Sequence, residues 1–226
     1  MAGEWKFSRL VTTSFSRYHR LSSSTYESVR LQELAGLAML IAEYNGLTRA
    51  TRIRDMLSWL AMYANVTEAL CKAAAMDTKV DPEIGVAIPN ETYSNCAKLW
   101  FADNWHQAVK YLHDITGGIS ATMPSWEDWQ NPETRKYIDK YLGGDAIYPT
   151  EDRIRALQKV NYEATSFRGT LAIHAEGSLA AQRMTIYQQA DWERFKAAAK
   201  YAMHMPTNHP DFKSLPTEPL WKLPVK

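Results

Sequence analysis

The stretch that decides the fold is residues 49–76, RATRIRDMLSWLAMYANVTEALCKAAAM. Apolar side chains recur in it at spacings of three and four residues or their multiples, at Ile53, Leu57, Leu60, Ala64 and Leu70. This periodicity places them on one face of a helix. The stretch therefore predicts a long amphipathic helix that buries one side in a core.

Long helices are predicted on both sides of this stretch. Upstream, Ser24 and Glu27 have the spacing of a capping box, and Gly46 follows the last periodic residue, so a helix is predicted over residues 25–45. Downstream, a third long helix is predicted over residues 92–115. Shorter helical segments are predicted from Ser125 onward, over residues 132–142, 150–167, 171–190 with a possible break at Gly177, and 191–203.

These elements predict a mainly α protein built as a helical bundle. A possible strand over residues 7–15 gives the bundle a short extended N-terminal segment, assigned to residues 1–20. The bundle domain is assigned to residues 21–205. Residues 206–226 contain five prolines and are predicted to form an extended C-terminal tail.

Composition excludes several classes of function. The 226 residues are 46% hydrophobic and 23% charged, and the net charge is +1, so neither nucleic acid nor an anionic membrane is an expected partner. The N-terminus lacks a signal sequence, and no window approaches about eighteen uncharged apolar residues. Cys71 and Cys96 are too few for a disulfide framework or a zinc site. A cytoplasmic protein that does not enter membranes is predicted.

Residues 114–125, DITGGISATMPS, are the first candidate site. Gly117 and Gly118 allow a ligand to approach the backbone, while Thr122 and Ser125 offer hydroxyl donors, so a flat or phosphorylated ligand is one interpretation. A plain helix C-cap is the other, and the residues alone leave both open. Together with Asp114, these four residues are the candidate cofactor-binding set.

The second candidate is HAEGS at residues 174–178. An acid beside a glycine, Glu176 followed by Gly177, is a plausible general base because the backbone can come close to a ligand there. A capped helix start is the competing interpretation. The sequence contains no GxSxG, P-loop or GxGxxG, which argues against a serine hydrolase, a nucleotide triphosphatase and a Rossmann cofactor site.

Four separate blocks carry a family resemblance. DITGGISATMPS, NPETRKYIDKYLGG at residues 131–144, TEDRIRALQ at residues 150–158 and IHAEGSLAAQRM at residues 173–184 resemble the C-terminal region of the 4-hydroxybutyryl-CoA dehydratase and 4-hydroxyphenylacetate 3-monooxygenase oxygenase family. These are flavoproteins with the acyl-CoA dehydrogenase fold. The resemblance implies an acyl-CoA dehydrogenase-like C-terminal helical bundle that lies against FAD and mediates tetramer contacts.

The resemblance also implies roles for individual residues. Glu176 falls on the active-site acid of the dehydratase, and His19 falls on the histidine that there ligates a [4Fe-4S] cluster, so both are predicted to be catalytic. The dehydratase pattern has a cysteine ligand seven residues after that histidine, where this chain has Tyr26. Because iron–sulfur clusters prefer thiolate, no cluster and no other metal are predicted in this chain.

A partner is implied as well. In the family, the segment that matches GEWKF at residues 3–7 ends a β-rich middle domain, which follows an N-terminal helical domain. These two domains have no counterpart here, and an apolar face left in water promotes association. The prediction is a split enzyme, in which this small subunit joins a larger subunit that supplies both domains, in a hetero-oligomer with a tetrameric core.

The leading functional hypothesis is therefore a subunit of a heteromeric FAD-dependent enzyme. It would act on an acyl-CoA or related thioester by dehydratase, isomerase or dehydrogenase chemistry, with Glu176 abstracting a proton beside the flavin and His19 as a second acid or base. One alternative is a component of a flavin-dependent aromatic hydroxylase. The other is a non-catalytic subunit that stabilises such an assembly.

Overall fold

A computed structural model of the protein describes residues 3–167, 169, 173 and 176–212. The chain divides into two compact units, Met1–Ile186 and Tyr187–Lys226. Most of the predicted helical bundle lies in the first unit. The boundary between the units falls within a helical segment near residue 187.

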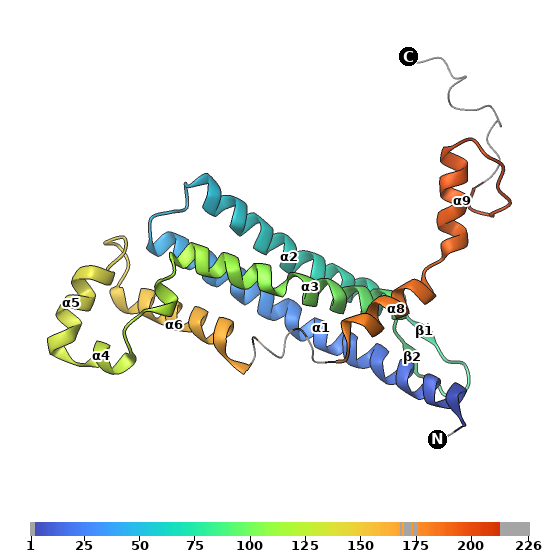
Figure 1. Ribbon diagram of the computed structural model, residues 1–226, viewed down its shortest axis with the longest axis horizontal. Helices are drawn as coiled ribbons and strands as arrows, with labels where there is room; N and C mark the ends of the chain where they lie inside the picture. The colour runs from blue at the N-terminus through green and yellow to red at the C-terminus, as the bar shows by residue number, and fades with distance from the viewer. Residues whose placement is uncertain (1–2, 168, 170–172, 174–175, 213–226) are drawn as a thin grey trace, which may run out of the picture. The chain divides into compact units, whose positions relative to one another are not determined.

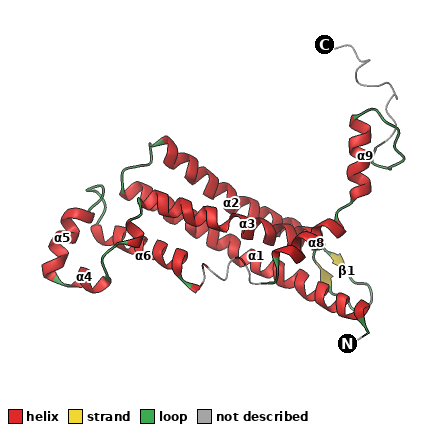
Figure 2. Cartoon of the chain, viewed as in Figure 1, coloured by secondary structure: helices red, strands yellow, loops and turns green. Residues whose placement is uncertain are grey.

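Three long helices form the body of the first unit. They are α1 (Trp5–Tyr44), α2 (Thr51–Met76) and α3 (Glu91–Thr116), which lie side by side in Figure 1 and pack on one another pairwise. Their ends agree with the predicted ends to within about two residues, apart from the start of α1. The mainly α bundle is thus confirmed, and Figure 2 shows how little strand accompanies it.

Apolar periodicity explains the core between the three helices. Leu34, Ala38 and Ile41 of α1 are at most 1% exposed and meet Leu60 of α2, as their three- and four-residue spacing requires. Aromatic rings fill the centre: Tyr63 stacks 6.0 Å from Phe101, and Phe101 lies 5.6 Å from Trp105. The hydroxyl of Tyr63 donates to the carbonyl of Phe101, and burial raises its pKa.

The extended N-terminal segment predicted for residues 1–20 is wrong for the described residues. From Trp5 onward the chain is helical, because neither glycine nor proline occurs between Glu4 and Gly36. Hydroxyl side chains inside this helix donate to the carbonyl four residues earlier, as Thr13 does to Arg9 at 2.9 Å. The predicted capping box at Ser24 is therefore in mid-helix, where Ser24 is fully buried and does not start a new element.

The remaining elements of the first unit are short. A two-stranded antiparallel hairpin, β1 (Lys79–Val80) and β2 (Ala87–Ile88), connects α2 to α3. After α3, the chain forms a 3₁₀ turn, η1 (Ile119–Ala121). Three helices follow and enclose a second core of Trp129, Ile138 and Ile154: α4 (Trp126–Gln130), α5 (Pro132–Leu142) and α6 (Thr150–Thr165).

Local signals explain where these short helices begin. Ser125 Oγ accepts from the amide of Asp128 at 3.1 Å, and the Asp128 carboxylate accepts from the Ser125 amide at 3.0 Å, so the two residues form a capping box at the start of α4. Asn131 caps α5, whose first residue is Pro132. Both helix starts could be placed from the sequence because each depends only on residues within one turn.

Two helices end the described chain. They are α8 (Leu179–Gln189) and α9 (Trp192–Ala202). The break predicted at Gly177 is present, because Gly177 has a φ of +97°. Residues 206–212 of the predicted tail contain neither helix nor strand, and residues 213–226 lie outside the described part of the chain. Within the described ranges, no helix is both long and apolar enough to span a bilayer.

The assigned core predicts that replacing Leu34 lowers the free energy of unfolding much more than replacing Leu40. Leu34→Ala removes a side chain that is 1% exposed and leaves a cavity, so the free energy of unfolding should fall by about 2–5 kcal/mol. Leu40→Ala, on the same helix but 44% exposed, should change it by less than about 1 kcal/mol. Urea unfolding followed by circular dichroism checks both values. Equal losses in the two variants would contradict the assigned orientation of α1.

Candidate functional site

Glu176 lies in a tight turn just before α8. Its φ is +64°, an unusual value for a residue with a side chain, and such a conformation costs about 1–3 kcal/mol unless contacts hold it. Ser178 Oγ accepts from the amide of Ala180 at 3.1 Å, so it caps the helix that follows. Both interpretations of HAEGS therefore have a basis here: a capped helix start, and an acid in a strained turn. His174 and Ala175 lie outside the described residues.

Two basic side chains hold the turn against the long helices. Lys98 Nζ of α3 lies 2.8 Å from Glu176 Oε2, and the exposed fractions of the two side chains are 1% and 12%. Arg20 of α1 donates from Nε to the backbone oxygen of Glu176 at 3.3 Å. Arg20 also donates from Nη1 to Asn95 Oδ1 at 2.5 Å, so it joins α1, α3 and the turn. The carboxylate and the backbone of Glu176 are thus held by different residues.

A second group of buried charges lies where α1 meets α6. Arg30 donates from Nε to Glu163 Oε2 at 2.8 Å, and Lys159 Nζ lies 2.6 Å from Glu163 Oε1. Burial alone would raise the pKa of Glu163, but the hydrogen bonds from Lys159 and Arg30 outweigh it and lower that pKa. The Arg30 guanidinium also lies 4.4 Å from the ring centroid of Trp105, which adds a cation–π contact in the core.

Burial affects the charged groups of α1 in opposite senses. Burial raises the pKa of Glu27, although the nearby Arg30 and Lys98 oppose the shift. Burial lowers the pKa of Arg20, against the attraction of Glu91 and Glu176. Carboxylates and cations therefore alternate along the buried face of α1, where an uncompensated charge would be costly.

The predicted cofactor-binding glycines end α3. Gly117 and Gly118 have φ values of +67° and +79°, and their amides donate to the carbonyls of Asp114 and His113, both at 3.1 Å. Asp114 pairs with Lys110 at 2.7 Å and with Arg52 at 3.6 Å. The Lys110 hydrogen bond lowers the pKa of Asp114. The C-cap interpretation accounts for both glycine amides, so a ligand here would need other donors.

Such donors lie just after the glycines. Ser125 lines a pocket of about 330 Å³ together with Ser120, Ala121, Met123, Pro124, Gln158 and Asn161. Asn161 Nδ2 of α6 donates to the Ser120 carbonyl at 3.0 Å and holds the two walls together. Ser125 Oγ accepts from the Asp128 amide, which leaves its hydroxyl proton for another acceptor. Thr122 is exposed next to this pocket in sequence.

The pocket at Ser125 fits one part of a flavin cofactor. Its hydroxyl and amide side chains suit phosphate or sugar oxygens, and its volume corresponds to the lower end of small-molecule sites. It is too small to enclose a whole dinucleotide. The remaining surface of such a cofactor would have to be covered by other parts of an enzyme.

His19 and Tyr26 are both exposed on α1, two turns apart. The His19 ring lies 5.0 Å from the ring of Phe15, and Tyr26 is 76% exposed. Cys71 is buried, and burial raises its pKa. Across the described residues, no three His, Cys, Asp or Glu side chains gather closely enough to hold a metal ion. A cluster-free chain remains a prediction, and His19 is not among the described contacts of Glu176.

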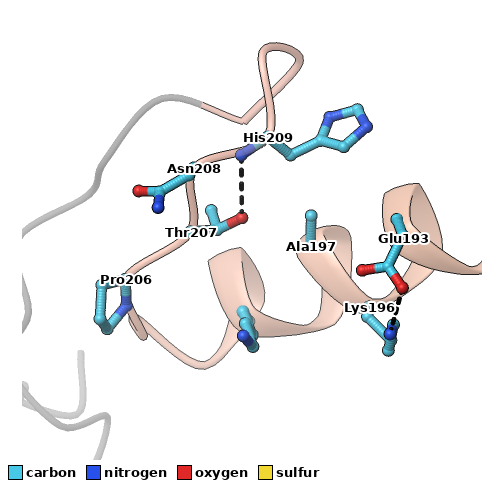
Figure 3. A pocket seen from close by; sticks show the side chains of 8 residues that line it. Glu193, Lys196, Ala197, Pro206, Thr207, Asn208 and His209 are labelled. Atoms are coloured by element: carbon cyan, nitrogen blue, oxygen red, sulfur yellow. Dashed lines mark hydrogen bonds and ion pairs between the residues drawn. The ribbon is translucent and has the colours of Figure 1, made fainter.

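Another pocket, of about 460 Å³, belongs to the second unit and contains no predicted site residue. It lies between α9 and the segment after it, where Figure 3 shows Lys196 and Glu193 on the helix and Thr207 and His209 on that segment. Lys196 Nζ pairs with Glu193 at 2.5 Å, and the His209 amide donates to Thr207 Oγ1 at 3.3 Å. Its charges are thus partly paired at the surface, so it ranks below the Glu176 turn as a reactive site.

The sequence analysis missed the buried partners of Glu176. Lys98 follows Asn95 by three residues and precedes Phe101 and Trp105 at helical spacing, so a lysine stands within the buried face of α3. Arg20 occupies the same kind of position on α1. A charge on the apolar face of a helix was the available signal, because such a charge needs a partner when it is buried.

Comparisons with known proteins identify a family for the chain. The family model for the C-terminal part of 4-hydroxyphenylacetate 3-hydroxylase matches residues 8–204. The chain is 27% identical over 210 residues to a 4-hydroxybutyryl-CoA dehydratase/vinylacetyl-CoA-Δ-isomerase from Clostridium aminobutyricum. That match covers 87% of this chain and 42% of the relative, so the chain spans less than half of its length.

Solved structures have the same fold. An oxygen-tolerant archaeal 4-hydroxybutyryl-CoA dehydratase from N. maritimus superposes with a TM-score of 0.81 and 25% identity, over 94% of this chain and 43% of that one. The oxygenase component of 4-hydroxyphenylacetate 3-monooxygenase, complexed with FAD and 4-hydroxyphenylacetate, superposes with a TM-score of 0.73. It is 16% identical, over 81% of this chain and 39% of that one, and supports the fold alone.

The Glu163 ion pairs predict a pH-dependent stability. The folded-state pKa of Glu163 is lowered, so its contribution is present above the unfolded pKa of about 4.3 and is lost as the pH falls through the folded value. Glu163→Gln should therefore lower the free energy of unfolding by about 3 kcal/mol at neutral pH, since it removes the buried carboxylate that pairs with Arg30 and Lys159. Urea unfolding from pH 3 to pH 7 measures how far the difference in the free energy of unfolding between wild type and Glu163→Gln becomes smaller in acid.

The matched control is Glu151→Gln, which removes an exposed ion pair with Arg155 from the same helix. An exposed pair of this kind is worth less than about 1 kcal/mol, so its loss should be small at every pH. A Glu163→Gln deficit that is equally large at pH 3 and pH 7 would show that the ion pairs are not its cause.

Proposed function

Because the chain belongs to the 4-hydroxyphenylacetate 3-hydroxylase C-terminal family, we propose that it is the C-terminal subunit of a split FAD-dependent enzyme resembling 4-hydroxybutyryl-CoA dehydratase. In this proposal the substrate is an acyl-CoA-type thioester, and Glu176 abstracts a proton from it. The observation that carries the proposal is the Glu176 turn: a carboxylate in a strained backbone conformation, paired with the buried Lys98. Strained, over-determined residues of this kind cluster at functional sites.

Glu176 can act as a base with one oxygen while the other stays bound. Lys98 pairs with Oε2, so Oε1 is the atom that takes the proton. The C–H bond next to the thioester carbonyl breaks, an O–H bond forms at Oε1, and the electron pair is delocalised toward the carbonyl. His19 is proposed as a second acid or base, since it is exposed on α1 next to Arg20, which contacts the Glu176 backbone.

The proposed cofactor is FAD, shared with the partner subunit. The solved oxygenase component named above binds FAD, and the pocket at Ser125 offers hydroxyl and amide groups for part of such a molecule. When bound, a flavin supplies a ring system that exchanges electrons or hydride with the substrate. This chain would contribute Ser125 and Thr122 as donors, while Asp114, Gly117 and Gly118 shape the loop that carries them.

The proposed partner is a larger subunit with the N-terminal helical and middle β domains, in a hetero-oligomer with a tetrameric core. The matched family model is a C-terminal one, so the missing part of a relative precedes the region that corresponds to α1. The first turns of α1 expose large apolar side chains: Trp5, Phe7, Leu10, Val11, Phe15 and Tyr18. Apolar residues gathered in this way mark interaction sites.

A second candidate is the oxygenase component of a flavin-dependent aromatic hydroxylase, which would use reduced flavin and oxygen. Three of the curated relatives are monooxygenases, the longest match among them being 22% identical over 199 residues. The dehydratase relative is more similar, and its match extends over more of this chain, which favours the first candidate. A third candidate is a non-catalytic assembly subunit. It differs from the first two because the complex would stay active after loss of the Glu176 carboxylate.

One experiment separates the three candidates. The complex is purified with its natural partner and assayed for flavin, iron and subunit composition, then tested anaerobically with 4-hydroxybutyryl-CoA and aerobically with reduced FAD and 4-hydroxyphenylacetate. The proposal expects stoichiometric FAD, anaerobic turnover of the thioester, and a loss of about 10²–10⁴-fold in kcat for Glu176→Gln, the usual contribution of a general base. Full activity in Glu176→Gln would support the assembly subunit, and turnover only with oxygen would support the hydroxylase.

The partner surface has its own test. Phe15→Glu places a charge on the exposed apolar face of α1, at a residue that is 66% exposed, so the chain should fold but its recovery with the larger subunit should drop at least about tenfold. Met62→Glu on α2, at a residue that is 44% exposed, is the matched control and should leave recovery unchanged. Pull-down of tagged variants coexpressed with the partner measures both. Equal recovery of the two variants would place the contact elsewhere.

A further inference from the structure

We infer that Lys98 is a positioning residue that holds the Glu176 carboxylate in one direction, and that Arg20 fixes the backbone turn on which this depends. The inference rests on the proposed function, because it takes Glu176 as the group that moves a proton. Neither Lys98 nor Arg20 is expected to touch the substrate. Their effect would pass through Glu176 alone.

The first step is burial. The Lys98 side chain is 1% exposed, yet it carries a charge, and the pair with Glu176 Oε2 at 2.8 Å compensates that charge. A lysine in such a place is not explained by packing, since an apolar side chain of similar length would fill the same space at no electrostatic cost. The ion pair therefore indicates that the Glu176 carboxylate needs a cation beside it.

The second step concerns the backbone. Glu176 at +64° and Gly177 at +97° form two consecutive left-handed residues, and Arg20 Nε reaches the carbonyl of the first. A Cβ on Gly177 would lie 3.4 Å from Arg20 Nη2, so the guanidinium sits against the turn. Arg20 is itself fixed by Asn95, which donates from Nδ2 to the Glu91 carbonyl at 2.7 Å.

The third step is the electrostatic balance at the carboxylate. Charged groups approach it from both long helices: Arg20 and Glu27 from α1, and Lys98 from α3, with Glu91 acting on Arg20. Of these groups, Lys98 contacts the Glu176 carboxylate itself, whereas Arg20 contacts the Glu176 backbone. The direction of the carboxylate therefore depends on Lys98, and the path of the turn depends on Arg20.

The test measures the reactivity of one carboxyl group. A water-soluble carbodiimide couples glycine ethyl ester to protonated carboxyl groups, and peptide mass spectrometry reads Glu176 and Glu163 separately in the full chain with its copurifying partner. In Lys98→Met, labelling of Glu176 at about pH 6 should become about tenfold faster, because the carboxylate loses the charge-assisted contact that holds it. Lys98→Arg retains the charge and should stay within about twofold of the wild-type rate.

Lys159→Met is the matched control, because Lys159 pairs with Glu163 at 2.6 Å. It should accelerate labelling of Glu163 and leave Glu176 unchanged. An unchanged Glu176 rate in a folded Lys98→Met chain overturns the inference. Acceleration in Lys98→Arg equal to that in Lys98→Met would overturn it too, since the charge would then be irrelevant.

If Lys98→Met does not fold, a comparison of stabilities still tests the inference. Breaking a buried pair leaves one uncompensated charge, whereas removing both charges does not, so Lys98→Met/Glu176→Gln should be more stable than Lys98→Met alone. Equal instability of the single and double variants would show that Lys98 matters for packing only. The proposed function fails independently, if Glu176→Gln retains full turnover while the labelling results stand.

Discussion

Compensation of buried charge is the constraint on which the rest of this structure depends. The long helices bury Lys98, Arg20 and Arg30 in or beside their apolar core. Glu176 and Glu163, from segments much later in the chain, supply carboxylates to Lys98 and Arg30. Because an uncompensated buried charge costs several kcal/mol, the later segments have few alternative places to pack.

Helix α6 connects the buried charges to the pocket at Ser125. Its Glu163 pairs with Arg30 of α1, and two residues earlier Asn161 binds the carbonyl of Ser120. The same helix thus fixes both the buried charges and one wall of the pocket at Ser125. The Glu176 turn and the pocket are therefore positioned by a shared framework of α1, α3 and α6, which gives rigid support to a site made from loops.

The sequence was sufficient where structure depends on local chemistry. The ends of α5, the capping box at Ser125 and the break at Gly177 follow from residues within a turn of each position. The sequence was insufficient where a hydroxyl side chain can either cap a helix or lie within one. Ser24 has the pattern of a cap but lies in mid-helix, because neither glycine nor proline interrupts α1 around it. The motif made Glu176 a candidate, but its partner Lys98 lies 78 residues earlier, and only the packed structure brings the two together.

The relatives that this chain matches are more than twice its length. We propose that the chain is one part of such an enzyme, in which the Glu176 carboxylate, held by Lys98, lies at the flavin. A structure of the partner complex with FAD bound tests this placement most directly. We expect the Glu176 carboxylate to lie beside the substrate space at the flavin, with residues 117–125 along the cofactor. A flavin bound entirely within the partner, away from Glu176 and Ser125, would contradict it.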